Sequence, residues 1–148
     1  MMEYEQLVIR KTLNHPRELV FEAWSKPEHL TNWLFPDIQV PMKVEEFNFI
    51  EGGKYRFSFH GPESVDTVAG IYEKINPPEG LAFTWTWEKS NQDAGVNTLI
   101  SIELIEKNNS TELLLTQKNF GSIEMCNRHK LGWEGAIHFL ETHLAQPS

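Results

Sequence analysis

The segment 122–144, SIEMCNRHKLGWEGAIHFLETHL, is the longest stretch of the chain with the apolar periodicity of one helix. Apolar residues recur in it at the spacings that a 3.6-residue period lays along one helix face. These residues are Cys126, Trp133, Ile137, Leu140 and Leu144. Ser122 is suited to cap the first turn, and Glu124 places negative charge near the positive end of the helix dipole. At 1.5 Å per residue, such a helix is about 33 Å long and can cross a small domain.

The composition fits one compact domain with a substantial core. Of the 148 residues, 40% are hydrophobic and 11% aromatic. The chain carries 13 basic and 21 acidic side chains and a formal net charge of -8, which disfavours general attraction to nucleic acid or to an anionic membrane. We therefore expect a single domain over residues 1–148 that binds no nucleic acid.

Cysteine usage and the N-terminal sequence indicate the compartment. Cys126 is the single cysteine, which excludes an internal disulfide and favours a reducing compartment. The first ten residues include Glu3 and Glu5 without an apolar run of signal-peptide length, and no segment approaches about 18 uninterrupted apolar residues. We expect a cytoplasmic protein with no membrane insertion.

The rest of the chain predicts one strand, two short helices and about six further strands before the long helix. Pro16 suits the first position of a helix that ends near Ser25, and a second start follows at residues 26–28, with Trp33 and Leu34 included before Pro36 ends that helix. Period-two alternation and turn residues predict the strands. The predicted strands lie at residues 4–13, 44–49, 55–60, 65–75, 81–87, and around 100–104 and 113–117.

Consecutive hairpins make an antiparallel sheet, and a sheet with one apolar face needs a covering layer, which the final helix can provide. The pattern therefore predicts an α+β fold in which about six to seven strands grip the long C-terminal helix.

Several short motifs occur in an order and spacing typical of one superfamily. They are residues 16–24, Pro27-Glu28-His29-Leu30 with Trp33, residues 52–57, Gly70, Pro77-Pro78-Glu79, residues 81–85 and Gly132-Trp133. Through them nearly the whole chain resembles the START-like (SRPBCC, Bet v 1-like) helix-grip superfamily, and within it the group similar to the activator of the heat-shock-protein-90 ATPase (AHSA-like). Two positions depart from that group: Leu34 stands where a second tryptophan is common, and Gln117 stands where many members carry histidine.

The resemblance implies a curved antiparallel sheet closing on the C-terminal helix, with a cavity between them that in relatives holds apolar or amphipathic small molecules. Ordinary core packing is the alternative interpretation of each aromatic side chain on that face. Gly70 either leaves a gap in the wall or marks a bend, and Gln117 is either a polar contact inside the cavity or an exposed amide at a strand end. The candidate cavity residues are Trp33, Phe57, Phe59, Gly70, Tyr72, Trp85, Trp87, Gln117, Phe120, Trp133 and Ile137.

Catalytic and metal-binding signatures are missing from the sequence. The six histidines form no metal-ligand spacing, and one cysteine cannot make a structural zinc site. We interpret His60 as solvent-exposed and Cys126 as core filling. An amide at Gln117 does not titrate in the useful range, which weakens acid/base chemistry there. We therefore predict no catalytic residue, no metal and no cofactor.

Three functions stay open. The first is a module, monomeric or homodimeric, that binds an apolar or amphipathic small molecule, with Tyr72 and Gln117 as candidate polar contacts. The second is a cyclase-like or hydrolase-like enzyme that uses the same pocket, because fold alone does not fix function. The third is a co-chaperone role by analogy with the namesake of the group. We do not expect a chaperone partner, because the chain aligns only with the helix-grip domain.

Overall fold

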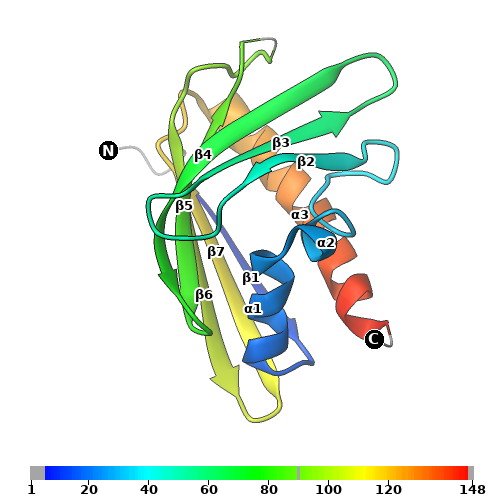
Figure 1. Cartoon of the computed structure of the whole chain (residues 1–148), viewed down its shortest axis with the longest axis vertical. Coiled ribbons are helices and arrows are strands. Elements are labelled where there is room, and N and C mark those ends of the chain that lie inside the picture. Colours follow the sequence, from blue (N-terminus) through cyan, green and yellow to red (C-terminus); the bar gives the residue numbers. More distant parts are fainter. Residues whose placement is uncertain (1–5, 90, 147–148) are drawn as a thin grey trace.

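The computed structural model describes residues 6–89 and 91–146 (Figure 1). The elements in chain order are β1 (Gln6–Leu13), α1 (Arg17–Ser25), α2 (Pro27–Leu30), β2 (Met42–Phe47), β3 (Lys54–His60), β4 (Val65–Asn76), β5 (Gly80–Trp87), β6 (Thr98–Lys107), β7 (Ser110–Lys118) and α3 (Ile123–Ala145). Within these residues, seven antiparallel strands form one sheet in the order β1-β7-β6-β5-β4-β3-β2. The predicted α+β helix-grip fold is confirmed.

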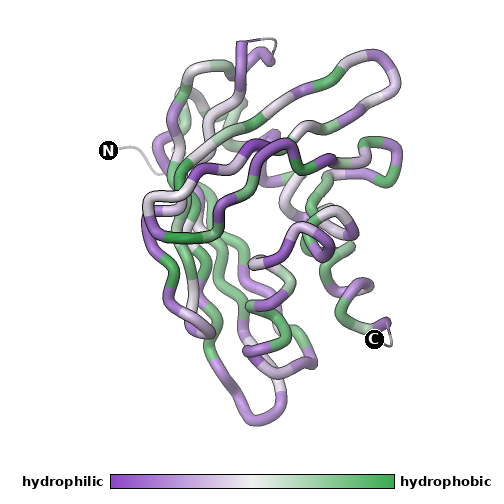
Figure 2. Tube along the Cα trace, viewed as in Figure 1, coloured by the Kyte–Doolittle hydropathy of each residue, from purple (hydrophilic) through white to green (hydrophobic). Residues whose placement is uncertain are grey.

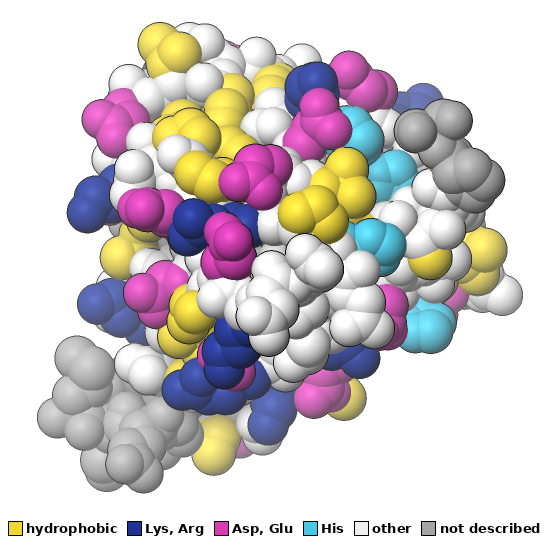
Figure 3. Space-filling view, turned by 90° about the horizontal axis from the view of Figure 1, so that it is seen from below, with side chains coloured by type: hydrophobic (Ala, Val, Ile, Leu, Met, Phe, Trp, Pro, Cys, Tyr) yellow, Lys and Arg dark blue, Asp and Glu magenta, His cyan; other side chains and the backbone are white. Residues whose placement is uncertain are grey.

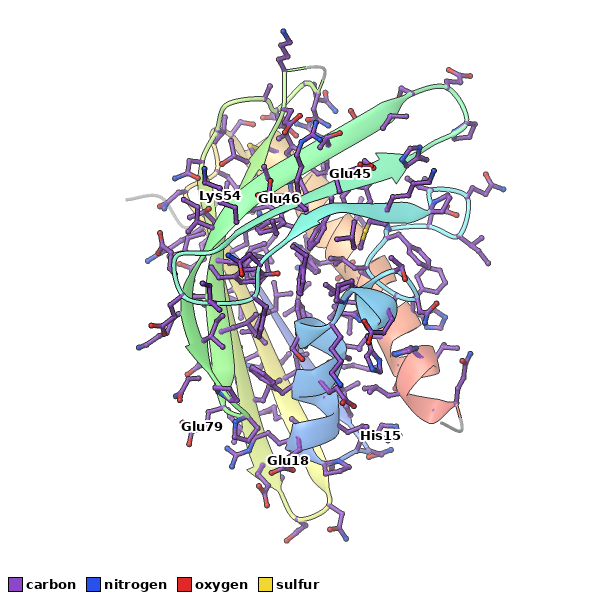
Figure 4. All side chains as sticks on the ribbon, in the orientation of Figure 1. His15, Glu18, Glu45, Glu46, Lys54 and Glu79 are labelled. Carbon is purple, nitrogen blue, oxygen red and sulfur yellow. The ribbon has the colours of Figure 1, made fainter. Side chains whose placement is uncertain are left out.

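The curved sheet wraps around α3, and α1 packs beside α3 against the same face (Figure 1). Apolar stretches run along the strands, and the β6–β7 turn at the lower tip is hydrophilic (Figure 2). Side chains fill the space between sheet and helices, whereas labelled charged residues such as Glu46, Lys54 and Glu79 lie on the outer side of the sheet or at its ends (Figure 4). The core therefore lies between one face of the sheet and the helices.

Helix α3 forms where the sequence predicts it. The Ser122 hydroxyl accepts a hydrogen bond from the backbone N–H of Met125 at 3.1 Å, which satisfies one free donor of the first turn. The five apolar residues of the predicted stripe are all buried, Leu140 completely. Burial of this stripe holds the helix against the sheet, since isolated helices gain little stability on their own.

The second short helix is shorter than predicted. α2 ends at Leu30, whereas the prediction continued it to Leu34. Trp33 is nevertheless fully buried, and its indole Nε1 donates to the carbonyl oxygen of Ala23 at 3.0 Å. The chain then crosses α3 so closely that a Cβ atom at Gly135 would collide with the carbonyl oxygen of Pro36. Beyond Leu30 the chain continues in turns, with the N–H of Leu34 donating to the carbonyl of Leu30 at 2.8 Å, so the helical spacing of Trp33 and Leu34 predicted a longer helix than forms.

The first two hairpin strands differ slightly from the prediction. β2 covers Met42–Phe47 instead of residues 44–49. The predicted turn is present: Gly52 adopts a φ of 85°, and the N–H of Gly53 donates to the carbonyl of Ile50 at 2.8 Å. The predicted start of the first strand at residue 4 lies outside the described residues. Within the described residues, β1 begins at Gln6.

Gly70 marks an interruption between β4 and β5. Gly70 and Ile71 have no paired residue on β5 within the described register, and the hydroxyl of Tyr55 donates to the carbonyl of Thr84 at 2.6 Å. The N–H of Ile71 donates to the Thr84 hydroxyl at 2.9 Å. A Cβ atom at Gly70 would collide with the Thr84 carbonyl. Gly70 is therefore a site of close backbone approach, a reason for glycine that differs from both the predicted gap and the predicted bend.

The lower face of the molecule mixes charges of both signs with scattered apolar side chains, and histidine side chains gather at one side of it (Figure 3). In the ranges 6–89 and 91–146, the structure contains no helix with an apolar stretch long enough to cross a membrane.

Candidate functional site

A cleft of about 240 Å³ lies between α3 and the sheet. One side is formed by α3 residues between 128 and 136, the other by Phe59 of β3 and by Trp85 and Trp87 of β5. Asp66 of β4 and the segments 34–40 and 91–93 complete its border, and the cleft opens to the surface. Its volume is slightly below the range of about 300–1,000 Å³ that is common for small-molecule sites.

The cleft wall is aromatic because strand β5 and helix α3 each direct tryptophan side chains toward it. Trp85 and Trp87 are two residues apart on β5 and therefore share one face of the strand. Trp133 of α3 lies opposite, with 5.4 Å between its ring centroid and that of Trp85. Phe59 lies 5.7 Å from Trp87, and the rings of Trp85 and Trp87 stand perpendicular to each other. These geometries are the edge-to-face and tilted arrangements that aromatic rings prefer.

Gln117 lies behind this wall and is fully buried. Its Oε1 accepts a hydrogen bond from Trp133 Nε1 at 2.8 Å, and its Nε2 donates to the Thr98 hydroxyl at 2.9 Å. Thr98 in turn donates to the carbonyl of Trp85 at 2.8 Å. The structure thus contradicts the alternative of an exposed strand-end amide. It assigns Gln117 a buried network that fixes two of the cleft tryptophans.

The structure brings four of the candidate residues together around the cleft: Phe59, Trp85, Trp87 and Trp133. The other candidates do not line it; these are Trp33, Phe57, Gly70, Tyr72, Gln117, Phe120 and Ile137. All of them except Gly70 are buried in the core. Burial raises the pKa of Tyr72, so its hydroxyl stays protonated at neutral pH.

His129 borders the cleft and was missed by the sequence analysis. Its Nε2 accepts a hydrogen bond from Trp87 Nε1 at 2.8 Å, and its Nδ1 lies 2.8 Å from the carbonyl oxygen of Met125. Since the indole and the carbonyl fix one acceptor and one donor on the ring, the imidazole is neutral with the proton on Nδ1. Burial lowers the pKa of His129, which favours the same neutral form.

A sequence signal for His129 does exist, because it precedes Trp133 by four residues and so shares its helix face. The border residues in the two loop segments carry no such signal. The segments 34–40 and 91–93 are irregular, and an Asp93–Arg128 ion pair joins one of them to α3. Periodicity does not place residues of loops.

The indole N–H groups differ in their hydrogen bonding. Those of Trp33, Trp87 and Trp133 donate to acceptors described above. Those of Trp24 and Trp85 are buried and have no acceptor within the described part of the chain. A buried donor without an acceptor costs about 1–3 kcal/mol. Of the two, only Trp85 lines the cleft.

A second polar cluster lies on the outer face of the sheet. The Ser58 hydroxyl oxygen lies 2.7 Å from Glu45 Oε2 and 2.9 Å from His60 Nε2. His60 is half-buried and hydrogen bonded, so its interpretation as solvent-exposed was wrong. An irregularity of β2 between Val44 and Glu46 places Glu45, labelled in Figure 4, within hydrogen-bond distance of Ser58 on β3. The Ser58 hydroxyl donates to the Glu45 carboxylate, which leaves an oxygen lone pair for its contact with His60.

Metal binding has no basis in the described residues. Across 6–89 and 91–146, no three His, Cys, Asp or Glu side chains are grouped so that they could hold a metal ion. The chemistry that the cleft offers is an aromatic surface with a few fixed polar groups.

Comparisons with solved structures support the fold. A crystal structure of a protein from Chromobacterium violaceum is 22% identical with a TM-score of 0.86, covering 97% of this chain and 99% of that one. A solution structure of a protein from Arthrobacter aurescens is 22% identical with a TM-score of 0.86, covering 99% and 89%. A crystal structure of a protein from Rhodobacter sphaeroides is 24% identical with a TM-score of 0.81, covering 98% and 95%. At these identities the likeness shows the fold alone.

The sequence itself matches a family. Residues 14–145 match the family described as "Activator of Hsp90 ATPase homolog 1-like protein". No curated protein matches the chain. The chain therefore belongs to the family of activator of Hsp90 ATPase homolog 1-like proteins, as an AHSA-like domain of the START/SRPBCC superfamily.

Proposed function

We propose that this protein binds a small apolar or amphipathic molecule in the cleft between α3 and the sheet. The observation that carries this proposal is the aromatic wall of Phe59, Trp85, Trp87 and Trp133 around a cleft of about 240 Å³. A concave, mostly apolar surface with a few placed polar groups is typical of small-molecule sites. Aromatic side chains that are exposed only to water are also unfavourable, because burial of apolar surface lowers the free energy.

Binding accounts for the cleft better than turnover does. A general base must have a free lone pair within reach of the substrate proton. Both ring nitrogens of His129 are engaged, and of the two carboxylates at the cleft, Asp66 and Asp93, the second is paired with Arg128. The Gln117 amide is engaged behind the wall. We therefore favour a binding module over a cyclase-like or hydrolase-like enzyme, and we place it in the cytoplasm as a monomer or homodimer.

The thermal midpoint of the purified protein, measured against sterols, fatty acids, flavonoids and aromatic ketones, tests the proposal. A ligand present at a hundred times its Kd stabilises the native state by about 2.7 kcal/mol, which is a shift of several degrees in a domain of this size. We expect the shift to be lost in Trp87→Leu, which removes part of the wall. It should persist in Phe47→Leu, where a half-buried ring outside the cleft is shortened.

Two results would overturn the proposal. One is the absence of any shift across all four compound classes. The other is a shift that Trp87→Leu leaves unchanged, because the compound would then bind elsewhere.

A further inference from the structure

We infer that the ligand of the cleft is an amphipathic ammonium compound, whose apolar body contacts the aromatic wall and whose positive charge lies beside the Asp66 carboxylate. This inference rests on the proposed binding function and names the class of ligand for the same cleft. It requires a carboxylate that faces the cleft, a cleft in which no cation of the chain balances that carboxylate, and walls that accept a positive charge.

The carboxylate belongs to Asp66 of β4, which borders the cleft. Asp66 pairs with Phe59 in the antiparallel register of β3 and β4, so the two side chains lie on the same face of the sheet. Val68, two residues further along β4, lies on this face too and is completely buried. The half-buried carboxylate of Asp66 therefore lies on the inner, aromatic face of the sheet.

Asp66 has no cationic partner of its own. Among the described residues 6–89 and 91–146, no Lys, Arg or His side chain forms an ion pair with it. Lys89 follows the two tryptophans of β5, but it is exposed and does not border the cleft. A half-buried carboxylate among apolar side chains loses part of its hydration, and a cation that enters the cleft can compensate for this loss.

The other charged groups at the cleft balance each other. Arg128, the one Lys or Arg among the described cleft residues, is paired with Asp93. His129 is held neutral by its two hydrogen bonds. The negative charge of Asp66 is therefore left uncompensated, on a chain with a formal net charge of -8. Such a site attracts a cation and repels an anion.

The aromatic side chains next to Asp66 also accept a positive charge. Phe59 lies directly opposite Asp66 on β3. Trp87 lies diagonally across from Asp66 on β5, because it pairs with Val68; such diagonal neighbours are about 7–8 Å apart. The ring centroids of Phe59 and Trp87 are 5.7 Å apart. A cation is attracted to the face of an aromatic ring within about 6 Å of its centroid, most strongly to tryptophan. An ammonium group beside the carboxylate thus meets aromatic rings on both neighbouring strands.

Three compounds with one phenylbutyl body and different charges test the inference. At neutral pH, 4-phenylbutylamine is a cation, 4-phenylbutan-1-ol is uncharged and 4-phenylbutyrate is an anion. We expect calorimetric titration of the wild-type protein to show binding of the amine roughly three- to thirtyfold tighter than binding of the alcohol, and the weakest binding for the anion. Added NaCl should reduce the advantage of the amine, because salt screens partly exposed charges.

Asp66→Asn removes the charge and keeps the shape of the side chain. In this variant the affinity ratio of amine to alcohol should fall by about two- to tenfold, and the part contributed by the aromatic rings should remain. Glu73→Gln is the matched control, because it changes the net charge equally on the same strand. Glu73 is exposed and does not border the cleft, so this variant should keep the full ratio.

If Asp66→Asn does not fold, NMR spectra of the wild-type protein with bound 4-phenylbutylamine provide a second measurement. We expect nuclear Overhauser effects between the methylene protons beside the nitrogen and the ring protons of Phe59 and Trp87. Contacts of these two rings with the phenyl end alone would contradict the inferred orientation.

Equal affinity of the wild-type protein for the amine and the alcohol would overturn the inference and leave the proposed function standing, because the shared apolar body would still bind. An undiminished ratio in Asp66→Asn would also overturn it, since the cation would then meet another group. So would an equal fall of the ratio in Glu73→Gln, which would show an effect of net charge alone. Absence of any shift in the thermal assay would overturn the proposed function as well.

Discussion

Trp133 on α3 and Gln117 on β7 are joined by a hydrogen bond of 2.8 Å between the indole Nε1 and the amide Oε1, and the amide is completely buried. This bond ties the long helix to the sheet directly behind the cleft wall. Because Gln117 also donates to Thr98, which donates to the Trp85 carbonyl, one amide links tryptophans on both sides of the cleft.

We expect Gln117→Leu to lower the free energy of unfolding by about 1–3 kcal/mol, because Trp133 Nε1 would remain buried without an acceptor. Urea denaturation measures this loss. Trp133→Phe and the double variant complete a double-mutant cycle. The double variant should lose less than the sum of the two single changes, since it no longer contains an unpaired donor or acceptor of that bond. Strictly additive losses would contradict the role given to this bond.

Two glycines of α3 form a matched pair for a packing test. A Cβ atom at Gly135 would collide with the Pro36 carbonyl, whereas one at Gly132 would lie 3.8 Å from the Pro36 side chain. We expect Gly135→Ala to lower the free energy of unfolding by about 1–3 kcal/mol through overpacking. Gly132→Ala should raise it by up to about 1 kcal/mol through helix propensity. Thermal melts of the two variants compare them directly, and equal effects would contradict the close crossing.

His129 makes stability depend on pH. Burial lowers the pKa of His129 in the folded protein below the value of about 6.5 in the unfolded chain. Below pH 6.5 the unfolded chain therefore binds more protons, so this contribution to stability is present above about pH 6.5 and is lost as the pH falls toward the folded pKa. We expect the thermal midpoint between pH 7 and pH 5 to fall more steeply for the wild type than for His129→Gln.

His143 has a lowered pKa as well, caused by burial and by the neighbouring His29. It is present in both proteins of that comparison, so the difference between the two pH profiles isolates His129. Parallel profiles would show that His129 is not held neutral by its environment.

The Ser122 N-cap stabilises the first turn of α3, and substitutions at this residue test its contribution. In Ser122→Ala the N–H of Met125 loses its side-chain acceptor. We expect a loss of about 1 kcal/mol in the free energy of unfolding, measured by chemical denaturation. Ser122→Asp should retain most of the stability, because a carboxylate also accepts this hydrogen bond and complements the helix dipole. If Ser122→Asp lost as much as Ser122→Ala, the capping bond would not account for the effect.

The fold could be predicted from the sequence where burial repeats with a regular period. Leu140 and Leu144 continue one stripe on α3, and Trp85 and Trp87 alternate with polar residues on β5, so each pattern reports the buried face directly. The early end of α2 could not be predicted in this way. Residues 31–33 form turns in place of a continued helix, and helical spacing alone does not distinguish the two.

The site was predicted only in part. Periodicity tells which face of a strand a residue lies on, but not whether it lies in the closed core or beside the cleft. Phe57 and Phe59 share one face of β3, yet only Phe59 lies beside the cleft. Phe57 packs instead against Phe47 and Tyr55 in the core, with ring centroids 6.5 and 4.5 Å away. Which residues border an opening is decided by the loops that leave it uncovered, and loops have no period.

The pairing of β1 with β7 places Gln6 beside Lys118 and has a consequence for how the chain reaches its native state. The hairpins from β2 to β7 join neighbours in the sequence, so they can form early, whereas the edge strand β1 must close a very long loop at an entropic cost. Because the chain is synthesised from its N-terminus, β1 remains unpaired until β7 has been synthesised. The aromatic face of the sheet stays uncovered for longer still, until α3 follows. Aggregation of nascent chains is therefore most probable in the interval before α3 docks.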